Sequence, residues 1–197
     1  MSKSGIRTEI KNLIIKNSPT LANQSREICK KIIESKEFKN AKEIFGYMAL
    51  PDEVDLTMVI QQALCTGKKV AVPKIMDQGN AQIQFFYLNC SQKIETQTQD
   101  GTFGIAEPDS DVLEAAELSD TPTLFLVPGR AFTKNGDRLG RGKGYYDRFL
   151  AKEIVGSSPT MTRSSYNITV AGVCFDFQVL PELPTDPNDI AMDIMFY

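Results

Sequence analysis

The stretch TLFLVPGRAFTKNGDRLGRGKGYYDRFL, residues 123–150, decides how we interpret this chain. An apolar run typical of a buried strand leads into a glycine-rich loop, which ends in residues that favour a helix. Between Pro128 and Arg148 the stretch holds five of the chain's 13 glycines, and six cations stand against two carboxylates. The net charge of the whole chain is -3. A strand, a basic loop and a helix N-terminus in this order predict a phosphate-binding site.

The details of this loop narrow the kind of phosphate site. Gly140, Gly142 and Gly144 would let backbone amides approach an anion without obstruction by a Cβ atom. The loop lacks G-x-x-x-x-G-K-[ST], and Asp147 stands where a dinucleotide fingerprint needs a small residue, so neither a Walker A loop nor a nicotinamide site is expected. Asp147 is placed to hold a magnesium ion beside the phosphates. The alternative is that Asp147 only complements the helix dipole and the glycines only form a connection.

Composition excludes several functional classes. A chain of 197 residues with 42% hydrophobic residues fits one globular domain, residues 1–197. A net charge of -3 and a pI near 5.1 argue against a nucleic-acid partner. The N-terminus has no continuous apolar run, so no signal peptide or membrane segment is expected, and we predict a cytoplasmic monomer. The four cysteines are far apart, as expected of reduced and mostly buried thiols.

The chain contains no histidine. This absence excludes Ser-His and Cys-His nucleophile pairs and histidine-ligated zinc. Phosphoryl transfer remains compatible, because it depends mainly on positioning and on stabilising the charge of phosphate oxygens.

Apolar spacing predicts alternating helices and strands. Ile6, Ile10, Leu13 and Ile14 indicate a first helix that ends before Ser18. A second helix should bury Ala22, Cys29, Ile32 and Ile33. We predict strands at 43–48, 68–75, 82–88, 123–127 and 168–173, helices at 56–65 and 145–154, and loops at 89–111 and 156–167. This order predicts an α/β fold: a single-domain, three-layer α/β/α, Rossmann-like arrangement with a mostly parallel central sheet. Ligands should bind at the carboxyl ends of the strands.

The run PGRAFTKNGDRLGRGKGYYDRFL closely resembles the signature of the 5-formyltetrahydrofolate cyclo-ligase family, also called 5,10-methenyltetrahydrofolate synthetase. Its pattern is P-G-x-x-F followed by G-x-R-L-G-x-G-x-G-Y-Y-D. Three other segments resemble family motifs in the same order: KSGIR (3–7) its Lys-x-x-x-Arg, DEVD (52–55) its D-E-V/I-D/E segment, and PNDIAMD (187–193) its closing N-D-x-x-x-D. The resemblance therefore covers essentially the whole chain.

The resemblance implies an ATP- and Mg²⁺-dependent ligase that forms a C–N bond in a reduced folate. Family members convert 5-formyltetrahydrofolate to 5,10-methenyltetrahydrofolate and release ADP and phosphate. The formyl oxygen attacks the γ-phosphorus of ATP, N10 then attacks the activated carbon, and phosphate leaves. Nothing in this route needs a histidine, and neither a nucleic acid nor a membrane is a partner.

The resemblance also implies roles for individual residues. The implied ATP-binding residues are Lys3, Arg7, Arg138, Leu139, Gly140, Arg141, Gly142, Lys143, Gly144, Tyr145 and Tyr146. Of these, Arg141, Lys143 and Tyr146 are the expected catalytic residues. The implied magnesium ligands are Asp147 and Asp193, and the implied folate-binding residues are Met48, Glu53 and Tyr146.

Without the resemblance, several of these residues have ordinary structural interpretations. Lys3 and Arg7 would form a solvated helix face, and Asp193 would be solvated near a terminus. Glu53 would be a loop charge before a helix. Met48 would be strand core, and Tyr145 and Tyr146 would pack the helix.

The chain also departs from the family pattern. Arg130 and Thr133 stand where the family more often has an apolar residue and an Asp, and Thr57 is displaced by one position from the Thr usual after E-V-D. Lys74 matches a position that is usually basic, where it would meet phosphate or the glutamate tail of the folate.

Two alternative functions remain open at this point. A non-catalytic nucleotide or anion sensor would bind ATP but release no ADP when 5-formyltetrahydrofolate is present. A sugar-phosphate isomerase would share a phosphate loop but needs a proton-transfer base. The absence of histidine weakens the second alternative without excluding Glu53 as that base.

Overall fold

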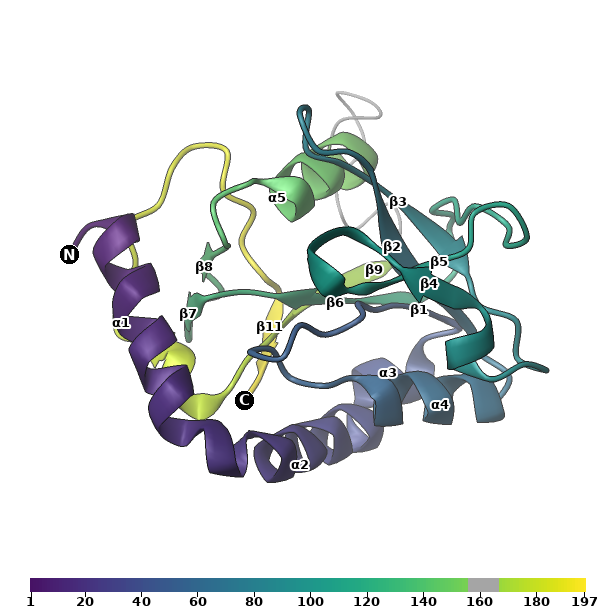
Figure 1. Cartoon of the computed structure of the whole chain (residues 1–197), viewed down its shortest axis with the longest axis horizontal. Helices are drawn as coiled ribbons and strands as arrows, with labels where there is room; N and C mark the ends of the chain where they lie inside the picture. The colour runs from purple at the N-terminus through teal and green to yellow at the C-terminus, as the bar shows by residue number, and fades with distance from the viewer. Residues whose placement is uncertain (156–166) are drawn as a thin grey trace.

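A six-stranded sheet forms the centre of the protein (Figure 1). The computed structural model describes residues 1–155 and 167–197. Across the sheet the strands are β11 (Ile194–Phe196), β9 (Ile168–Val173), β6 (Thr123–Pro128), β1 (Glu43–Phe45), β2 (Lys69–Asp77) and β3 (Gln82–Tyr87). Only β3 runs antiparallel within this sheet, where it pairs with β2. The prediction of an α/β fold with a mostly parallel sheet is confirmed.

The strands at the centre of the sheet are buried on both faces. Every residue of β6 and β1 is buried, as expected for parallel strands that are covered by other elements on each side. On one face the rings of Phe45, Phe85 and Phe125 pack with centroids 5.1 to 5.2 Å apart. On the other face Ile44 and Leu124 join the second apolar cluster. Continuous apolar runs therefore account for the position of the sheet.

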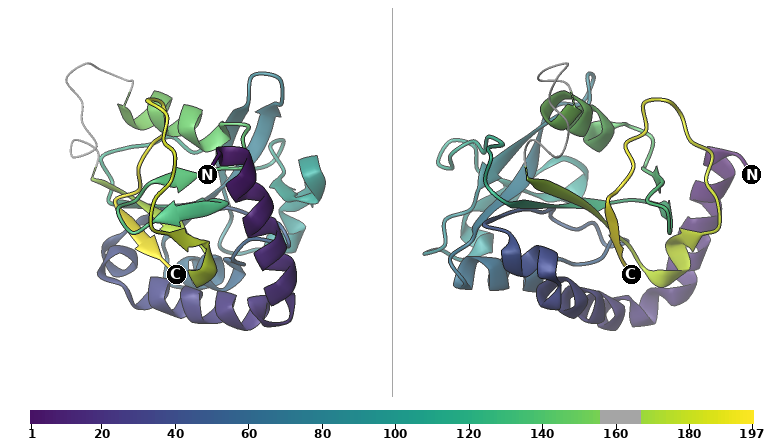
Figure 2. Two further views of the ribbon diagram at one scale, coloured as in Figure 1. Left: turned by 90° about the vertical axis from the view of Figure 1, so that its left-hand side faces the viewer. Right: turned by 180° about the vertical axis from the view of Figure 1, so that it is seen from behind.

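Helices lie on both faces of the sheet (Figures 1 and 2). One face carries α2 (Leu21–Glu34), α3 (Lys36–Asn40) and α4 (Thr57–Cys65), and the other carries α5 (Tyr145–Leu150), which continues as a π-helical turn, η4 (Ala151–Val155). The first helix, α1 (Lys3–Asn17), ends at a 3-10 turn, η1 (Ser18–Thr20), because Pro19 has no N–H to continue the ladder. No described helix is both long and apolar enough to span a bilayer.

Two small sheets complete the described part of the chain. β7 (Ala131–Thr133) pairs with β8 (Arg138–Leu139) and β10 (Val179–Leu180), and α1 packs beside this sheet (Figure 1). β4 (Thr98–Asp100) and β5 (Ala106–Pro108) form a hairpin. Three 3-10 turns lie beside these sheets: η2 (Ile94–Thr96), η3 (Thr102–Gly104) and η6 (Asp176–Gln178). The small sheet β10-β7-β8 includes the first part of the glycine-rich loop, because β7 and β8 lie before Gly140.

Several local predictions were wrong. The segment 89–111 contains a hairpin because its strands are stabilised by backbone bonds and by Glu107, without the apolar alternation that marks a strand. β1 ends at Phe45 instead of residue 48, and the helix that begins at Tyr145 is α-helical only to Leu150. In α2, Ala22 is exposed and Ile28 is buried instead.

The cysteine prediction holds for half of the thiols. Cys29 and Cys174 are buried, but Cys65 and Cys90 are exposed, at the end of α4 and in the turn after β3. Residues 156–166 of the predicted loop 156–167 lie outside the described residues. The single-domain organisation stays a prediction.

Candidate active site

A cavity of about 450 Å³ lies beyond the carboxyl ends of β6 and β1. This volume falls within the range of small-molecule sites, and the position agrees with the expected ligand crevice of a parallel sheet. Its lining comes from four segments that are distant in sequence: the chain after β1, the hairpins β2–β3 and β4–β5, and the glycine-rich loop with the start of α5. The predicted substrate residues Met48, Glu53 and Tyr146 all line it. Seven of the predicted nucleotide residues line the same cavity: Arg138, Gly140, Arg141, Lys143, Gly144, Tyr145 and Tyr146. Lys3, Arg7, Leu139 and Gly142 are not among its lining residues, and Leu139 is buried in β8.

One wall of the cavity is apolar and was missed by sequence reasoning. Besides Met48 it includes Pro73, Ile75 and Ile83 from β2 and β3, and Phe103 and Ile105 from the β4–β5 hairpin. Phe103 is 58% exposed and has a φ of 61°, an uncommon backbone conformation for a bulky residue. A signal was present in G-T-F-G, where an aromatic residue stands between glycines in a polar stretch. This wall gives the cavity a continuous set of apolar lining residues.

Two tyrosines at the cavity have hydroxyl groups that keep their protons. Burial, followed by the nearby charge of Glu53, raises the pKa of both Tyr47 and Tyr146 well above the usual value. The Tyr47 hydroxyl donates to the Val54 carbonyl at 2.9 Å. Tyr145 also lines the cavity, and its hydroxyl is buried without a hydrogen-bond partner within the described residues.

The glycine-rich loop has two parts, which we call the root (residues 129–140) and the tip (residues 141–144). In the root, Arg138 is 4% exposed and its guanidinium donates to the Pro128 carbonyl at 3.1 Å and to the Asp147 carboxylate at 2.8 Å. It also lies over the Tyr146 ring, 5.8 Å from the centroid. Its Nε is buried without a partner among the described residues. Arg138 therefore fixes the start of α5 against the end of β6.

The turn between β7 and β8 fixes the root to the C-terminal segment. The Met192 N–H donates to the Gly136 carbonyl at 2.8 Å. Gly136 has a φ of 94°, and a Cβ atom there would lie 2.2 Å from the Met192 carbonyl oxygen. In the same turn the Thr133 hydroxyl accepts from the Asp137 N–H and donates to the Asp137 carboxylate. Only glycine therefore fits at position 136, against the Met192 carbonyl.

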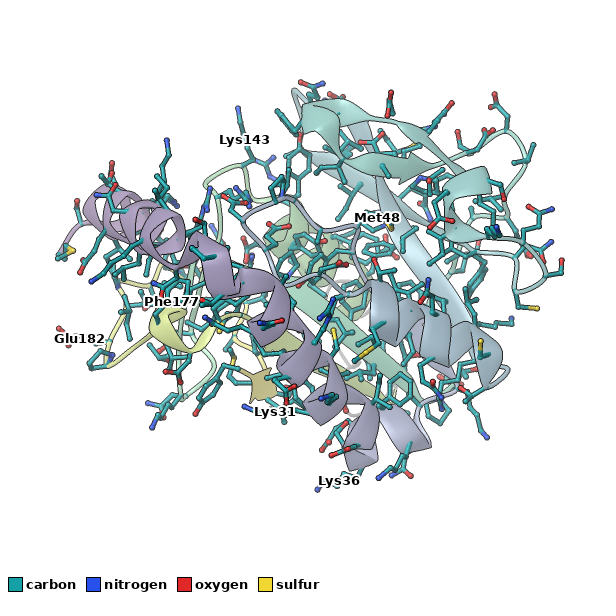
Figure 3. All side chains as sticks on the ribbon, turned by 60° about the horizontal axis from the view of Figure 1, so that its bottom comes forward. Lys31, Lys36, Met48, Lys143, Phe177 and Glu182 are labelled. Carbon is teal, nitrogen blue, oxygen red and sulfur yellow. The ribbon has the colours of Figure 1, made fainter. Side chains whose placement is uncertain are left out.

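The tip is exposed and relies on glycine geometry. Gly142 and Gly144 have φ values of 101° and 75°, which non-glycine residues rarely adopt. Lys143 is exposed at the tip, where Figure 3 labels it, and like Met48 it is among the residues that line the cavity. Because α5 has only six α-helical residues, an anion bound at the tip would be attracted more by the amides and cations of the tip than by the helix dipole.

The N-terminal cations have separate partners. The Arg7 Nε donates to the Gly140 carbonyl at 2.9 Å, so α1 contacts the root, and the binding of ATP by Arg7 stays a prediction. Lys3 instead lies 2.7 Å from Asp186 and 2.6 Å from Asp189, where the C-terminal segment passes the start of α1 (Figure 2). Burial alone would raise the pKa of Asp189, but the Lys3 ammonium holds it below its usual value. Arg7 lies at the loop, while Lys3 is neutralised by carboxylates.

The two predicted magnesium ligands lie in different surroundings. Asp147 lines the cavity in the first turn of α5 and pairs with Arg138. Asp193 accepts from the Val170 N–H at 2.8 Å, beside β9. Magnesium is commonly held by one or two carboxylates together with substrate phosphates and water, so the Asp147 carboxylate fits this chemistry. The described residues contain no group of three or more acidic or cysteine side chains that would hold a metal by themselves. A shared role for Asp147 and Asp193 stays a prediction.

Carboxylates and arginines also meet at the mouth of the cavity. Arg141 donates from Nε to the Glu53 Oε1 at 2.9 Å and from Nη2 to the same oxygen at 2.8 Å, and it pairs with Asp52. Arg130 stands where the family more often has an apolar residue, and its Nη1 lies 2.6 Å from the Asp52 Oδ2. Lys74, which matches a usually basic position of the family, donates to the Ser110 hydroxyl at 2.7 Å. The predicted nucleotide residue Arg141 and the predicted folate residue Glu53 are therefore in direct contact.

Comparisons with known proteins agree with this arrangement. The model of the 5-formyltetrahydrofolate cyclo-ligase family matches residues 1–197. The chain is 29% identical to the mouse 5-formyltetrahydrofolate cyclo-ligase, over 100% of this chain and 93% of the mouse protein. It is 35% identical to a probable 5-formyltetrahydrofolate cyclo-ligase of Schizosaccharomyces pombe, over 88% and 83% of the two chains.

A solved structure shows the same fold. The structure of Aquifex aeolicus 5,10-methenyltetrahydrofolate synthetase superposes with a TM-score of 0.76 at 29% identity, and the match covers 99% of this chain and 89% of that one. The full-length match to the family model, the sequence relatives and this structure agree with one another. The chain belongs to the 5-formyltetrahydrofolate cyclo-ligase family.

Proposed function

We propose that this protein catalyses the ATP- and Mg²⁺-dependent cyclisation of 5-formyltetrahydrofolate to 5,10-methenyltetrahydrofolate, with release of ADP and phosphate. The observation that carries the proposal is one cavity that is lined by the glycine-rich loop, by Glu53 and by an apolar wall. Membership of the family supports the same reaction. The substrate is a reduced folate, and we expect the protein to act as a cytoplasmic monomer without nucleic-acid or membrane partners.

The substrate pose follows from the chemistry of the walls. Met48, Ile83 and Phe103 offer apolar area to the pterin and aminobenzoyl rings. Glu53 supplies a carboxylate that accepts hydrogen bonds from the amino and ring N–H groups of the pterin. The root and tip supply the phosphate side, with Arg7 at the root. In this pose the formyl group lies between Glu53 and the loop.

The reaction then depends mainly on positioning and charge. The formyl oxygen attacks the γ-phosphorus of ATP and ADP leaves; N10 attacks the activated carbon and phosphate leaves. Arg141 and Lys143 neutralise the charge that develops on the phosphate oxygens. Tyr146 and the apolar wall exclude water, so that N10 reaches the activated carbon before hydrolysis does. Bound magnesium would neutralise phosphate charge, and Asp147 is the carboxylate placed to hold it.

A single assay tests the proposal and separates it from the two alternatives. Purified protein is mixed with 5-formyltetrahydrofolate, ATP and magnesium, and the near-ultraviolet absorbance of the methenyl product is followed together with ADP. We expect both products to appear in equal amounts. ATP binding without ADP release would indicate a sensor, and phosphate-sugar isomerisation without any need for ATP would indicate an isomerase. The absence of methenyl product would overturn the proposal.

A further inference from the structure

Four charged side chains from three segments meet at the mouth of the cavity. Asp52 and Glu53 come from the chain between β1 and α4, Arg130 follows β6, and Arg141 lies at the loop tip. The Asp52 Oδ2 pairs with Arg130 and the Oδ1 pairs with Arg141, whose Nη1 also donates to the Oδ2 at 3.4 Å. Glu53 binds Arg141 through Oε1. We call this group the arginine–carboxylate bridge.

Glu53 has little capacity left while Arg141 is bound. Its Oε1 accepts both the Nε and Nη2 groups of Arg141, and its Oε2 accepts the Leu50 N–H at 3.1 Å. A carboxylate offers about four acceptor positions in total. In the proposed function the pterin brings two N–H donors of the same kind. Arg141 therefore occupies acceptor positions on Glu53 that the substrate needs, and the substrate has to displace it.

Asp52 differs from Glu53 in its exposure to the substrate. Asp52 and Arg130 are not among the described residues that line the cavity, whereas Glu53 and Arg141 are. Burial alone would raise the pKa of Asp52, but the hydrogen bond and charge of Arg141, together with Arg130, hold it below its usual value. Asp52 is therefore an anion that Arg130 keeps in place and that the substrate does not contact.

From this geometry we propose that Asp52 is a positioning residue, which keeps Arg141 at the cavity mouth when the folate takes over Glu53. Because Asp52 continues to balance the charge of Arg141, release of Glu53 costs little free energy. The proposal rests on the proposed function for the identity of the two ligands. It adds a residue that touches neither ligand to the set that governs their binding.

Removal of the Asp52 carboxylate should make folate binding depend on the nucleotide. In Asp52→Asn, Glu53 is the remaining carboxylate of the bridge for Arg141, so a folate that takes Glu53 leaves a guanidinium without its counter-charge. The phosphates of a bound nucleotide would supply the missing anion. Coupling between two sites is reciprocal, so nucleotide binding would strengthen folate binding more in the variant than in the wild type.

The test measures the Kd for 5-formyltetrahydrofolate by titration calorimetry, with and without magnesium and a non-hydrolysable ATP analogue. We expect Asp52→Asn to weaken folate binding by at least about fivefold without the analogue, and to lie within about twofold of the wild type at saturating analogue. The matched control is Asp55→Asn, three residues along the same segment. Asp55 is exposed and caps Thr57 at the start of α4, a role that asparagine also performs, so this variant should bind like the wild type in both conditions.

Other outcomes would overturn the inference. Equal weakening with and without the analogue would mean that Asp52 acts on the folate itself or on the fold, and unchanged affinity in both conditions would remove its role. Asp52→Ser removes the carboxylate in a second way and has to give the same nucleotide dependence. If the wild type binds neither ligand, the proposed function fails and this inference fails with it. If the wild type binds both and the variants show no dependence, only the inference fails.

Discussion

Arg138 and Arg141 lie three residues apart in one loop, yet they are held in opposite ways. Arg138, in the root, is 4% exposed and is held by a backbone carbonyl, a carboxylate and an aromatic ring. Arg141, in the tip, is 33% exposed and is held by two carboxylates at the cavity mouth. The root is a packed part of the fold. The tip is partly exposed, and its Arg141 binds the carboxylates of Asp52 and Glu53. From this comparison we predict that the root contributes more to stability and that the tip contributes more to the binding and turnover of the proposed ligands.

The largest effect should come from removing the root cation. Arg138→Met leaves Asp147 without its partner beside a buried site, and breaking such a pair destabilises a fold by about 3–5 kcal/mol. Denaturant unfolding measures this loss, and turnover should fall with it because the start of α5 is no longer fixed. Arg148→Met is the control, since Arg148 is exposed and contacts only the Asn80 carbonyl among the described hydrogen bonds. An unchanged unfolding midpoint in Arg138→Met would remove the distinction between root and tip.

The tip should show the reverse pattern. Arg141→Ala removes a cation that neutralises phosphate charge in the proposed reaction, so kcat/KM for ATP should fall on the order of 10² to 10³-fold. The Arg141 side chain is 33% exposed, against 4% for Arg138, so the free energy of unfolding should fall by less than in Arg138→Met. Lys134→Ala, at an exposed cation in the β7–β8 turn, controls for the change of net charge. A large loss of stability in Arg141→Ala would place the tip in the same class as the root.

The smallest effect should be the change in the stability contribution of Asp52 when the pH is lowered. The folded-state pKa of Asp52 lies below its unfolded value, so its contribution to stability is present above the ordinary carboxyl pKa of about 4 and is lost as pH falls through the lower folded value. The difference in unfolding free energy between the wild type and Asp52→Asn should therefore shrink on acidification below about pH 4. Urea titrations between neutral and acidic pH measure it. A difference that stays constant over that range would show that Asp52 is not ionised in the fold.

Sequence patterns predicted the parts of the fold that rest on local regularity. The apolar run 123–127 and the strand 168–173 appear in the structure as β6 and β9, because burial of consecutive apolar residues needs no distant information. The strands β7, β8 and β10 have two or three residues each, too few for a period to be visible. They exist because distant segments supply their hydrogen-bond partners.

The same division applies to the site. The motif around Gly140 to Asp147 indicated the cavity wall, and Glu53 was found through its own short motif. The contact between Arg141 and Asp52 joins residues 89 positions apart, and no local pattern of charges specifies which pair will meet. The strained turn at Phe103 was missed for a related reason, since its place depends on the hairpin that carries it.

The contact between Gly136 and Met192 also sets an order of events during synthesis. The loop root emerges from the ribosome well before the residues around Met192, whose backbone completes the β7–β8 turn. The same late segment supplies Asp186 and Asp189 to Lys3 on the first helix. A nascent chain that already contains the entire signature motif therefore still lacks a finished loop. An early-terminated product would carry the motif without the backbone contact that holds the β7–β8 turn.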